Sequence, residues 1–125
     1  MTSVLIIEDE PGLGRLMSWS LLDAVFEVAI VMDGDQAIER MRTYHPDVVI
    51  FNTVIDPGRK QHVIASLREL APKTRILDVS EEKNLRSQGL IKPRDGDTTA
   101  DAALDIPIPA DRLIAAVHDL LASAR

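Results

Sequence analysis

The chain alternates short apolar runs with stretches in which apolar residues recur every three or four positions. The run Val4–Ile7 is apolar throughout, as expected of a strand covered on both faces of its sheet. Apolar runs that alternate with helical patterns are typical of repeated β-α units on a parallel sheet. We therefore predict an α/β fold, (βα)5, with strands at Val4–Ile7, Val28–Met32, Asp47–Asn52, Arg75–Ser80 and Ala102–Ile108.

Helix boundaries can also be read from the sequence. Pro11 suits the first turn of a helix, where the missing N–H group of proline has no intrahelical partner. Asp33 is a helix N-cap within a turn with Gly34, and we predict a second turn at Asp56-Pro57-Gly58. The expected inner helix faces carry Leu13, Leu16, Met17, Leu21 and Ala24; Ala37, Ile38 and Met41; Val63, Ile64, Leu67 and Leu70; and Leu113, Ile114, Val117, Leu120 and Leu121.

Residues 81–99 break this regularity. Gly89, Pro93 and Gly96 prevent a long regular helix there. We expect a short or irregular fourth helix, followed by an irregular loop. With 125 residues and no linker or internal repeat, the expectation is a single domain of residues 1–125 without an output domain.

Composition excludes several classes of protein. The chain has no cysteine, so it has neither disulfides nor a cysteine-based zinc site. It has no apolar stretch of roughly 20 residues and no signal-peptide pattern, which favours a cytoplasmic protein without a membrane span. Its net charge of −6 disfavours direct binding to nucleic acid.

Polar residues stand where the first and third predicted strands end. Glu8 and Asp9 follow Val4–Ile7, and Asn52 ends the third strand. Parallel strands of an open α/β sheet bind ligands in the crevice at their carboxyl ends. We therefore expect these three side chains to lie in one crevice.

Five segments together resemble the receiver domain of two-component response regulators, over essentially the whole chain. They are Val4–Glu10, Asp33–Ile38, Pro46–Asn52, Ile76–Ser80, and Ile106-Pro107 followed by an amphipathic helix. The resemblance implies a flavodoxin-like, doubly wound sheet of five strands in the order 2-1-3-4-5.

The resemblance also implies a role for each polar strand end. A working receiver accepts a phosphoryl group on an aspartate, binds Mg²⁺ with an acidic pair, and holds the phosphoryl oxygens with a hydroxyl and a lysine. By position the acidic pair is Glu8 and Asp9, and the hydroxyl is Ser80. The acceptor position carries Asn52, and the lysine position carries Ile106.

Both departures affect the chemistry. The amide of Asn52 is not a competent nucleophile toward phosphorus, and Ile106 offers no charge to a phosphoryl group. Ala103 also stands where many receivers carry a tyrosine or phenylalanine. The sequence therefore predicts a stand-alone, degenerate receiver that binds a protein of a signalling pathway independently of phosphorylation. We expect no catalysis, because the three histidines are scattered without a serine or cysteine partner.

Several alternatives stay open at this point. Asp56 is a substitute phosphoryl acceptor in one of them, and Lys92 is a substitute for the missing lysine in another. Glu8, Asp9 and Asn52 form either a weakened Mg²⁺ site, which would make the protein a metal-binding regulator, or a vestigial cluster at exposed loop ends. No cofactor is required by either interpretation. Trp19 lies off the inner stripe of the first helix and marks either a protein interface or a side chain covered by its neighbours. The resemblance implies that a homodimer would pair through the last strand and helix, Ala102–Ala122.

Overall fold

Five parallel strands form one sheet in the order β2-β1-β3-β4-β5, which confirms the predicted fold. The computed structural model describes residues 2–9, 15, 18–22, 24, 26–52, 57–81, 100–106 and 109–122. Residues 18–22 are helical. The other elements are β1 (Ser3–Glu8), β2 (Glu27–Val31), α2 (Gly34–Arg40), β3 (Val48–Asn52), α3 (Pro57–Leu70), β4 (Arg75–Glu81), β5 (Ala102–Ile106) and α5 (Ala110–Ala122).

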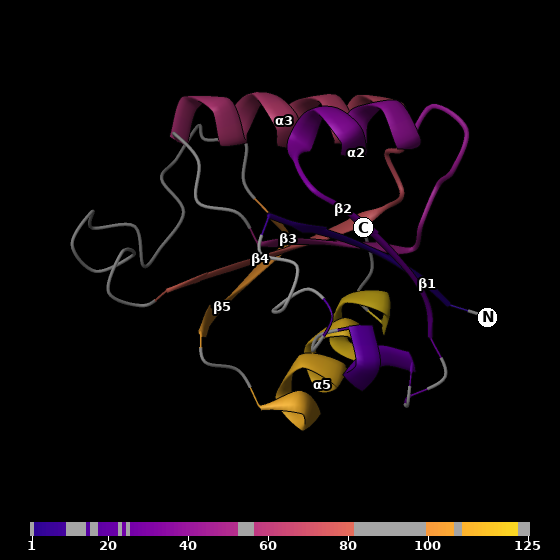
Figure 1. Ribbon diagram of the computed structural model, residues 1–125, viewed down its shortest axis with the longest axis vertical. Coiled ribbons are helices and arrows are strands. Elements are labelled where there is room, and N and C mark those ends of the chain that lie inside the picture. The colour runs from indigo at the N-terminus through magenta and orange to yellow at the C-terminus, as the bar shows by residue number, and fades with distance from the viewer. Residues whose placement is uncertain are drawn as a thin grey trace.

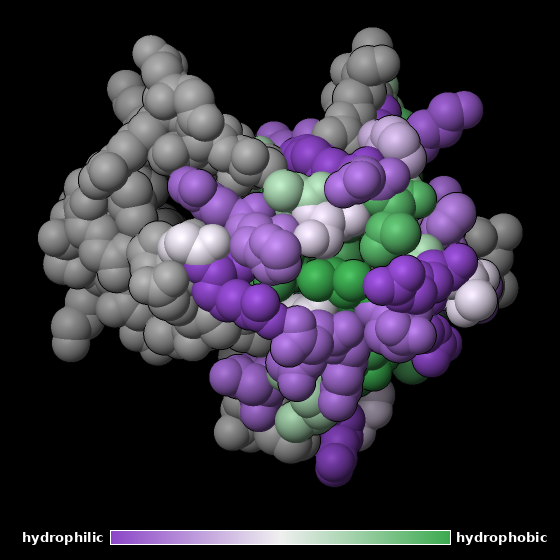
Figure 2. Space-filling view, turned by 90° about the horizontal axis from the view of Figure 1, so that it is seen from above, coloured by the Kyte–Doolittle hydropathy of each residue, from purple (hydrophilic) through white to green (hydrophobic). Residues whose placement is uncertain are grey.

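The helices lie on both faces of the sheet (Figure 1). Helices α2 and α3 cover one face, and α5 covers the other together with the helical residues 18–22. Viewed from the side of α2 and α3, the described surface is mostly hydrophilic, with hydrophobic atoms visible between the polar side chains (Figure 2). None of the helices among the described residues is both long and apolar enough to span a membrane.

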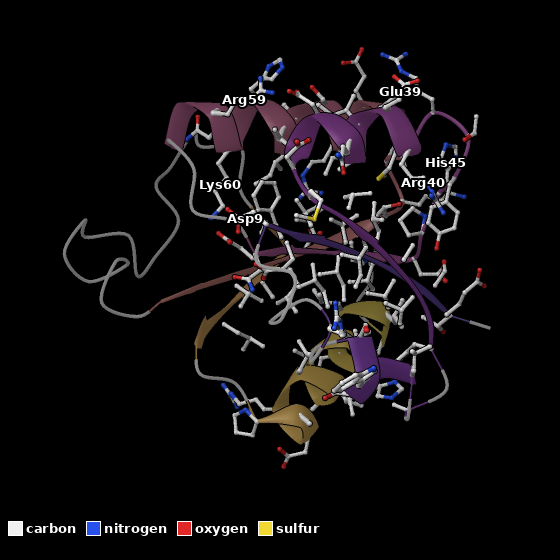
Figure 3. All side chains as sticks on the ribbon, viewed as in Figure 1. Asp9, Glu39, Arg40, His45, Arg59 and Lys60 are labelled. Atoms are coloured by element: carbon white, nitrogen blue, oxygen red, sulfur yellow. The ribbon has the colours of Figure 1, made fainter. Side chains whose placement is uncertain are left out.

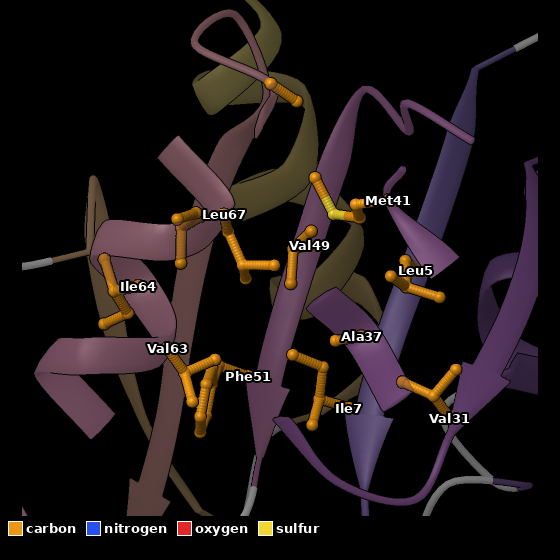
Figure 4. Close-up of a cluster of buried hydrophobic side chains, with 12 residues drawn as sticks. Leu5, Ile7, Val31, Ala37, Met41, Val49, Phe51, Val63, Ile64 and Leu67 are labelled. Carbon is orange, nitrogen blue, oxygen red and sulfur yellow. The ribbon is translucent and has the colours of Figure 1, made fainter. Parts of the chain in front are cut away.

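Each central strand contributes side chains to two hydrophobic cores, because successive side chains point to opposite faces of the sheet. Leu5 and Ile7 of β1 pack beneath α2 and α3, whereas Val4 and Ile6 pack against α5. The core beneath α2 and α3, shown in Figure 4, consists of Leu5, Ile7, Val31, Ala37, Met41, Val49, Phe51, Val63, Ile64, Leu67, Ala71 and Ile76. Burial on both faces explains why the strands read as continuous apolar runs.

The start of α2 confirms the predicted cap. The Asp33 carboxylate accepts a hydrogen bond of 2.8 Å from the backbone N–H of Gln36. The Gln36 side chain in turn accepts one of 2.8 Å from the N–H of Met32. Met32 thus belongs to the capping structure, so β2 ends at Val31 and the predicted end of this strand was wrong by one residue.

The predicted turn at residues 56–58 was wrong for its last two residues. Helix α3 begins at Pro57 and includes Gly58. Proline fits the first turn of a helix because no intrahelical acceptor is needed there for its missing N–H. Asp56 itself lies outside the described residues.

Strand ends differ from the sequence prediction elsewhere by one residue. Strand β3 begins at Val48, and the carboxylate of the preceding Asp47 instead accepts hydrogen bonds from the N–H and hydroxyl of Ser3, at 2.9 and 3.3 Å. Strand β4 extends to Glu81. The predictions for the fourth helix, for the loop up to residue 99 and for positions 107 and 108 fall outside the described residues.

Candidate functional site

Glu8 and Asn52 meet at the carboxyl ends of β1 and β3. The two residues are direct partners in the register of these strands. Both are buried, with exposed fractions of 2% for Glu8 and 7% for Asn52. The amide nitrogen of Asn52 donates a hydrogen bond to the Glu8 carboxylate. The predicted crevice therefore brings these two polar strand ends together as a buried hydrogen-bonded pair.

Asp9 lies at the same edge of the sheet but is exposed (Figure 3). The predicted acidic pair is thus divided between a buried and a solvated carboxylate. The interpretation of both carboxylates as exposed loop-end groups is wrong for Glu8, whose exposed fraction is only 2%. Within the described ranges, no three histidine, aspartate or glutamate side chains come together as a metal ion would require.

Ser80 and Ile106 occupy the carboxyl ends of β4 and β5. In the register of these strands Ser80 pairs with Asp105, and Glu81 pairs with Ile106. Both positions therefore lie at the carboxyl edge of the sheet, where Glu8 and Asn52 also lie. Ile106 brings no charge to it. The proposed substitutes Asp56 and Lys92 lie outside the described residues.

The sequence as a whole matches one family. The family model of the response regulator receiver domain covers residues 4–118. That span includes β1 except for Ser3, the other four strands, α2, α3 and most of α5. The chain belongs to the response regulator receiver domain family. It is accordingly a receiver domain of two-component signalling.

Among curated proteins, this receiver is similar to the transcriptional regulatory protein DltR of Streptococcus agalactiae serotype III (strain NEM316). The two are 26% identical over 115 residues, which is 92% of this chain and 50% of DltR. The chain therefore spans about half the length of the curated relatives that it matches over most of its own length. The expectation that residues 1–125 carry no output domain stays a prediction.

Solved structures share the fold of this receiver. The chemotaxis response regulator CheY4 of Vibrio cholerae superposes with a TM-score of 0.77 at 22% identity, covering 96% of this chain and 98% of CheY4. The receiver domain of the sensor histidine kinase PA1611 of Pseudomonas aeruginosa PAO1 gives 0.77 at 16% identity, with 98% of both chains covered. That domain was solved with a magnesium ion coordinated in its active site cleft.

One charged pair of the receiver was missed in the sequence. The Lys60 ammonium of α3 lies 2.7 Å from Oδ1 of Asp78 in β4, and 5.5 Å from the centre of the Phe51 ring. Figure 3 shows Lys60 extending from α3 toward the sheet. Asp78 stands between the apolar residues Leu77 and Val79 of β4, and a carboxylate in that position needs a partner. The position of Asp78 in the sequence therefore indicates an ion pair, but no feature of the neighbouring sequence identifies Lys60 as its partner.

Trp19 is exposed, as its position off the inner stripe predicted. Its exposed fraction is 57%, and that of Leu22, three residues further on, is 52%. Ser18 and Leu21 on the inner side of the same helical segment are buried. This part of the receiver therefore presents a tryptophan and a leucine to solvent from neighbouring positions on one helix.

Proposed function

We propose that this receiver acts as a phosphorylation-independent protein-binding module of two-component signalling. The observation that carries the proposal is the Asn52 side chain at the acceptor position, held by its hydrogen bond to Glu8. An amide does not form an acyl phosphate, and this one is buried at 7% exposure. Ile106 adds no cation that would stabilise a phosphoryl group.

A module that is not switched by phosphorylation must act through its surface. Trp19 and Leu22 support a protein interface, since tryptophan is enriched among the residues that contribute most to binding energy. A second copy of the chain is the partner that can be tested first, which would make the protein a homodimer. The acidic net charge supports a protein rather than a nucleic-acid partner. A cytoplasmic location and the absence of catalysis belong to the same proposal.

The proposal is tested by exposing the protein to a phosphoryl donor. The protein is incubated with acetyl phosphate and Mg²⁺, and its intact mass is measured over time. We expect no added phosphoryl group. An added group in the wild type that disappears in Asp56→Ala would overturn the proposal and assign the acceptor to Asp56.

A back-substituted variant provides the positive control. Asn52→Asp with Ile106→Lys restores the acceptor and the lysine of the family pattern. We expect this double variant to gain a phosphoryl group under the same conditions, because the acidic pair and the Ser80 position are still present. The comparison shows that the assay detects an acceptor in this scaffold.

A further inference from the structure

We infer that the Asn52 amide group takes the place of a divalent cation beside Glu8 and closes the crevice to Mg²⁺. The nitrogen of the amide, rather than its oxygen, faces the carboxylate. Mg²⁺ requires oxygen ligands in near-octahedral geometry, and an N–H group cannot be one of them. The donor set at these positions therefore does not fit the ion that the family implies.

Burial makes this arrangement hard to reverse. To coordinate a cation through its oxygen, the amide would have to rotate and lose the hydrogen bond that its nitrogen donates to Glu8. At 2% and 7% exposure, water has little access to replace that hydrogen bond. Both residues are fixed by the ladder between β1 and β3, in which they are direct partners.

Charge leads to the same conclusion. Carboxylates that share a site repel one another, and a bound cation relieves that repulsion. Here an amide occupies the position of one carboxylate and donates to Glu8, while Asp9 is exposed to solvent. Over the described ranges no third acidic side chain joins these two. With an amide in place of one carboxylate, the crevice holds less negative charge and less repulsion for a cation to relieve.

Exclusion of the cation is a property separate from the proposed function, which rests on the absence of a phosphoryl acceptor. The two are tested by different measurements. Thermal unfolding without any phosphoryl donor reports on Mg²⁺, because a ligand that binds only the folded state raises Tm. The mass measurement reports on phosphorylation.

The experiment compares Tm in millimolar MgCl₂ with Tm in NaCl of equal ionic strength. We expect identical values for the wild type. Asn52→Asp should have a lower Tm in NaCl, because two carboxylates then meet, and should regain stability specifically in MgCl₂. The matched control is Glu8→Gln with Asn52→Asp, which keeps one carboxylate and one amide and should show no response specific to Mg²⁺.

Two results would overturn the inference. One is a rise in the Tm of the wild type that is specific to MgCl₂. The other is an Asn52→Asp variant that folds and yet does not respond to Mg²⁺. Should that variant fail to fold, Mn²⁺ titration of the wild type decides the matter: paramagnetic broadening of the Asp9 and Asn52 amide signals contradicts the inference, and unbroadened signals support it.

Discussion

At residue scale, a hydrogen bond joins the two buried polar strand ends of the crevice. Asn52 and Glu8 are 44 positions apart and are joined at the ends of adjacent strands. The Asn52 amide donates a hydrogen bond to the buried Glu8 carboxylate. That bond offsets part of the free-energy cost of removing the carboxylate from water. The same pair therefore affects both the chemistry of the site and the stability of the fold.

The contribution of this pair to stability can be measured with Asn52→Ala. We expect the free energy of unfolding to fall by about 1–3 kcal/mol, because the buried Glu8 carboxylate loses a donor. Urea denaturation followed by circular dichroism measures the change. Adding Glu8→Gln to the same variant should recover part of the loss, since a neutral amide is less costly to bury. An unchanged denaturation midpoint in Asn52→Ala would contradict this account.

Lys60 and Asp78 are a second residue pair on which stability depends. Their side chains are 20% and 19% exposed, so each ion is largely removed from water. We expect Lys60→Met and Asp78→Leu each to lower the free energy of unfolding by roughly 1–3 kcal/mol, somewhat less than for a fully buried pair. The double variant should lose less than the sum of the two, because neither charge is then left behind. Strict additivity in this double-mutant cycle would show that the pair is not coupled.

At the scale of elements, α2 and α3 approach each other closely at a glycine. A Cβ atom added at Gly34 would lie 2.6 Å from Cγ2 and 3.1 Å from Cγ1 of Val63. Val63 is fully buried in the core beneath these helices and has little room to move. Asp35 and Arg59 form an ion pair across the same two helices. Glycine at position 34 therefore sets how near α2 can lie to α3.

Gly34→Ala should destabilise the protein by about 1–3 kcal/mol, as expected for overpacking. Thermal unfolding measures the loss. The matched variant Gly34→Ala with Val63→Ala removes the clash, so it should lose less than the sum of the two single changes. If the single variant is as stable as the wild type, the two helices can shift apart more freely than their packing indicates.

At the scale of the whole molecule, the exposed Trp19 and Leu22 contrast with the mostly hydrophilic surface over α2 and α3 (Figure 2). The surface over α2 and α3 is suited to contact with water because most of its side chains are hydrophilic. An exposed tryptophan next to an exposed leucine is suited to a partner, and the proposed homodimer provides one. If the proposed homodimer forms, we expect it to use the side of the sheet on which residues 18–22 lie.

Trp19→Ala tests that assignment. We expect the free energy of unfolding to change by less than about 0.5 kcal/mol, because an exposed side chain contributes little to the folded monomer. Sedimentation velocity at increasing protein concentration should show association of the wild type, weakened about tenfold or more in the variant, as for a binding hot spot. Equal sedimentation of the two proteins at every concentration would remove Trp19 from the interface.

Much of the fold could be predicted because its signals are local. The apolar run Val4–Ile7 lies within strand β1, and Asp33 caps a helix through neighbours within three residues. The predicted element boundaries were wrong at residues whose local sequence is compatible with two different structures. Pro57 is compatible with both a turn and a first helical turn, and Met32 continues the apolar pattern of a strand although its N–H bonds to Gln36.

The sequence by itself determined that a parallel α/β sheet brings polar strand ends to one edge, and that the acceptor position carries an amide. Only the tertiary structure decided that Glu8 is buried while Asp9 is not, that the Asn52 nitrogen faces Glu8, and that Lys60 finds Asp78. The physical reason is that periodicity and capping act between residues close in sequence. Burial and the direction of a hydrogen bond depend instead on atoms brought together from distant parts of the chain.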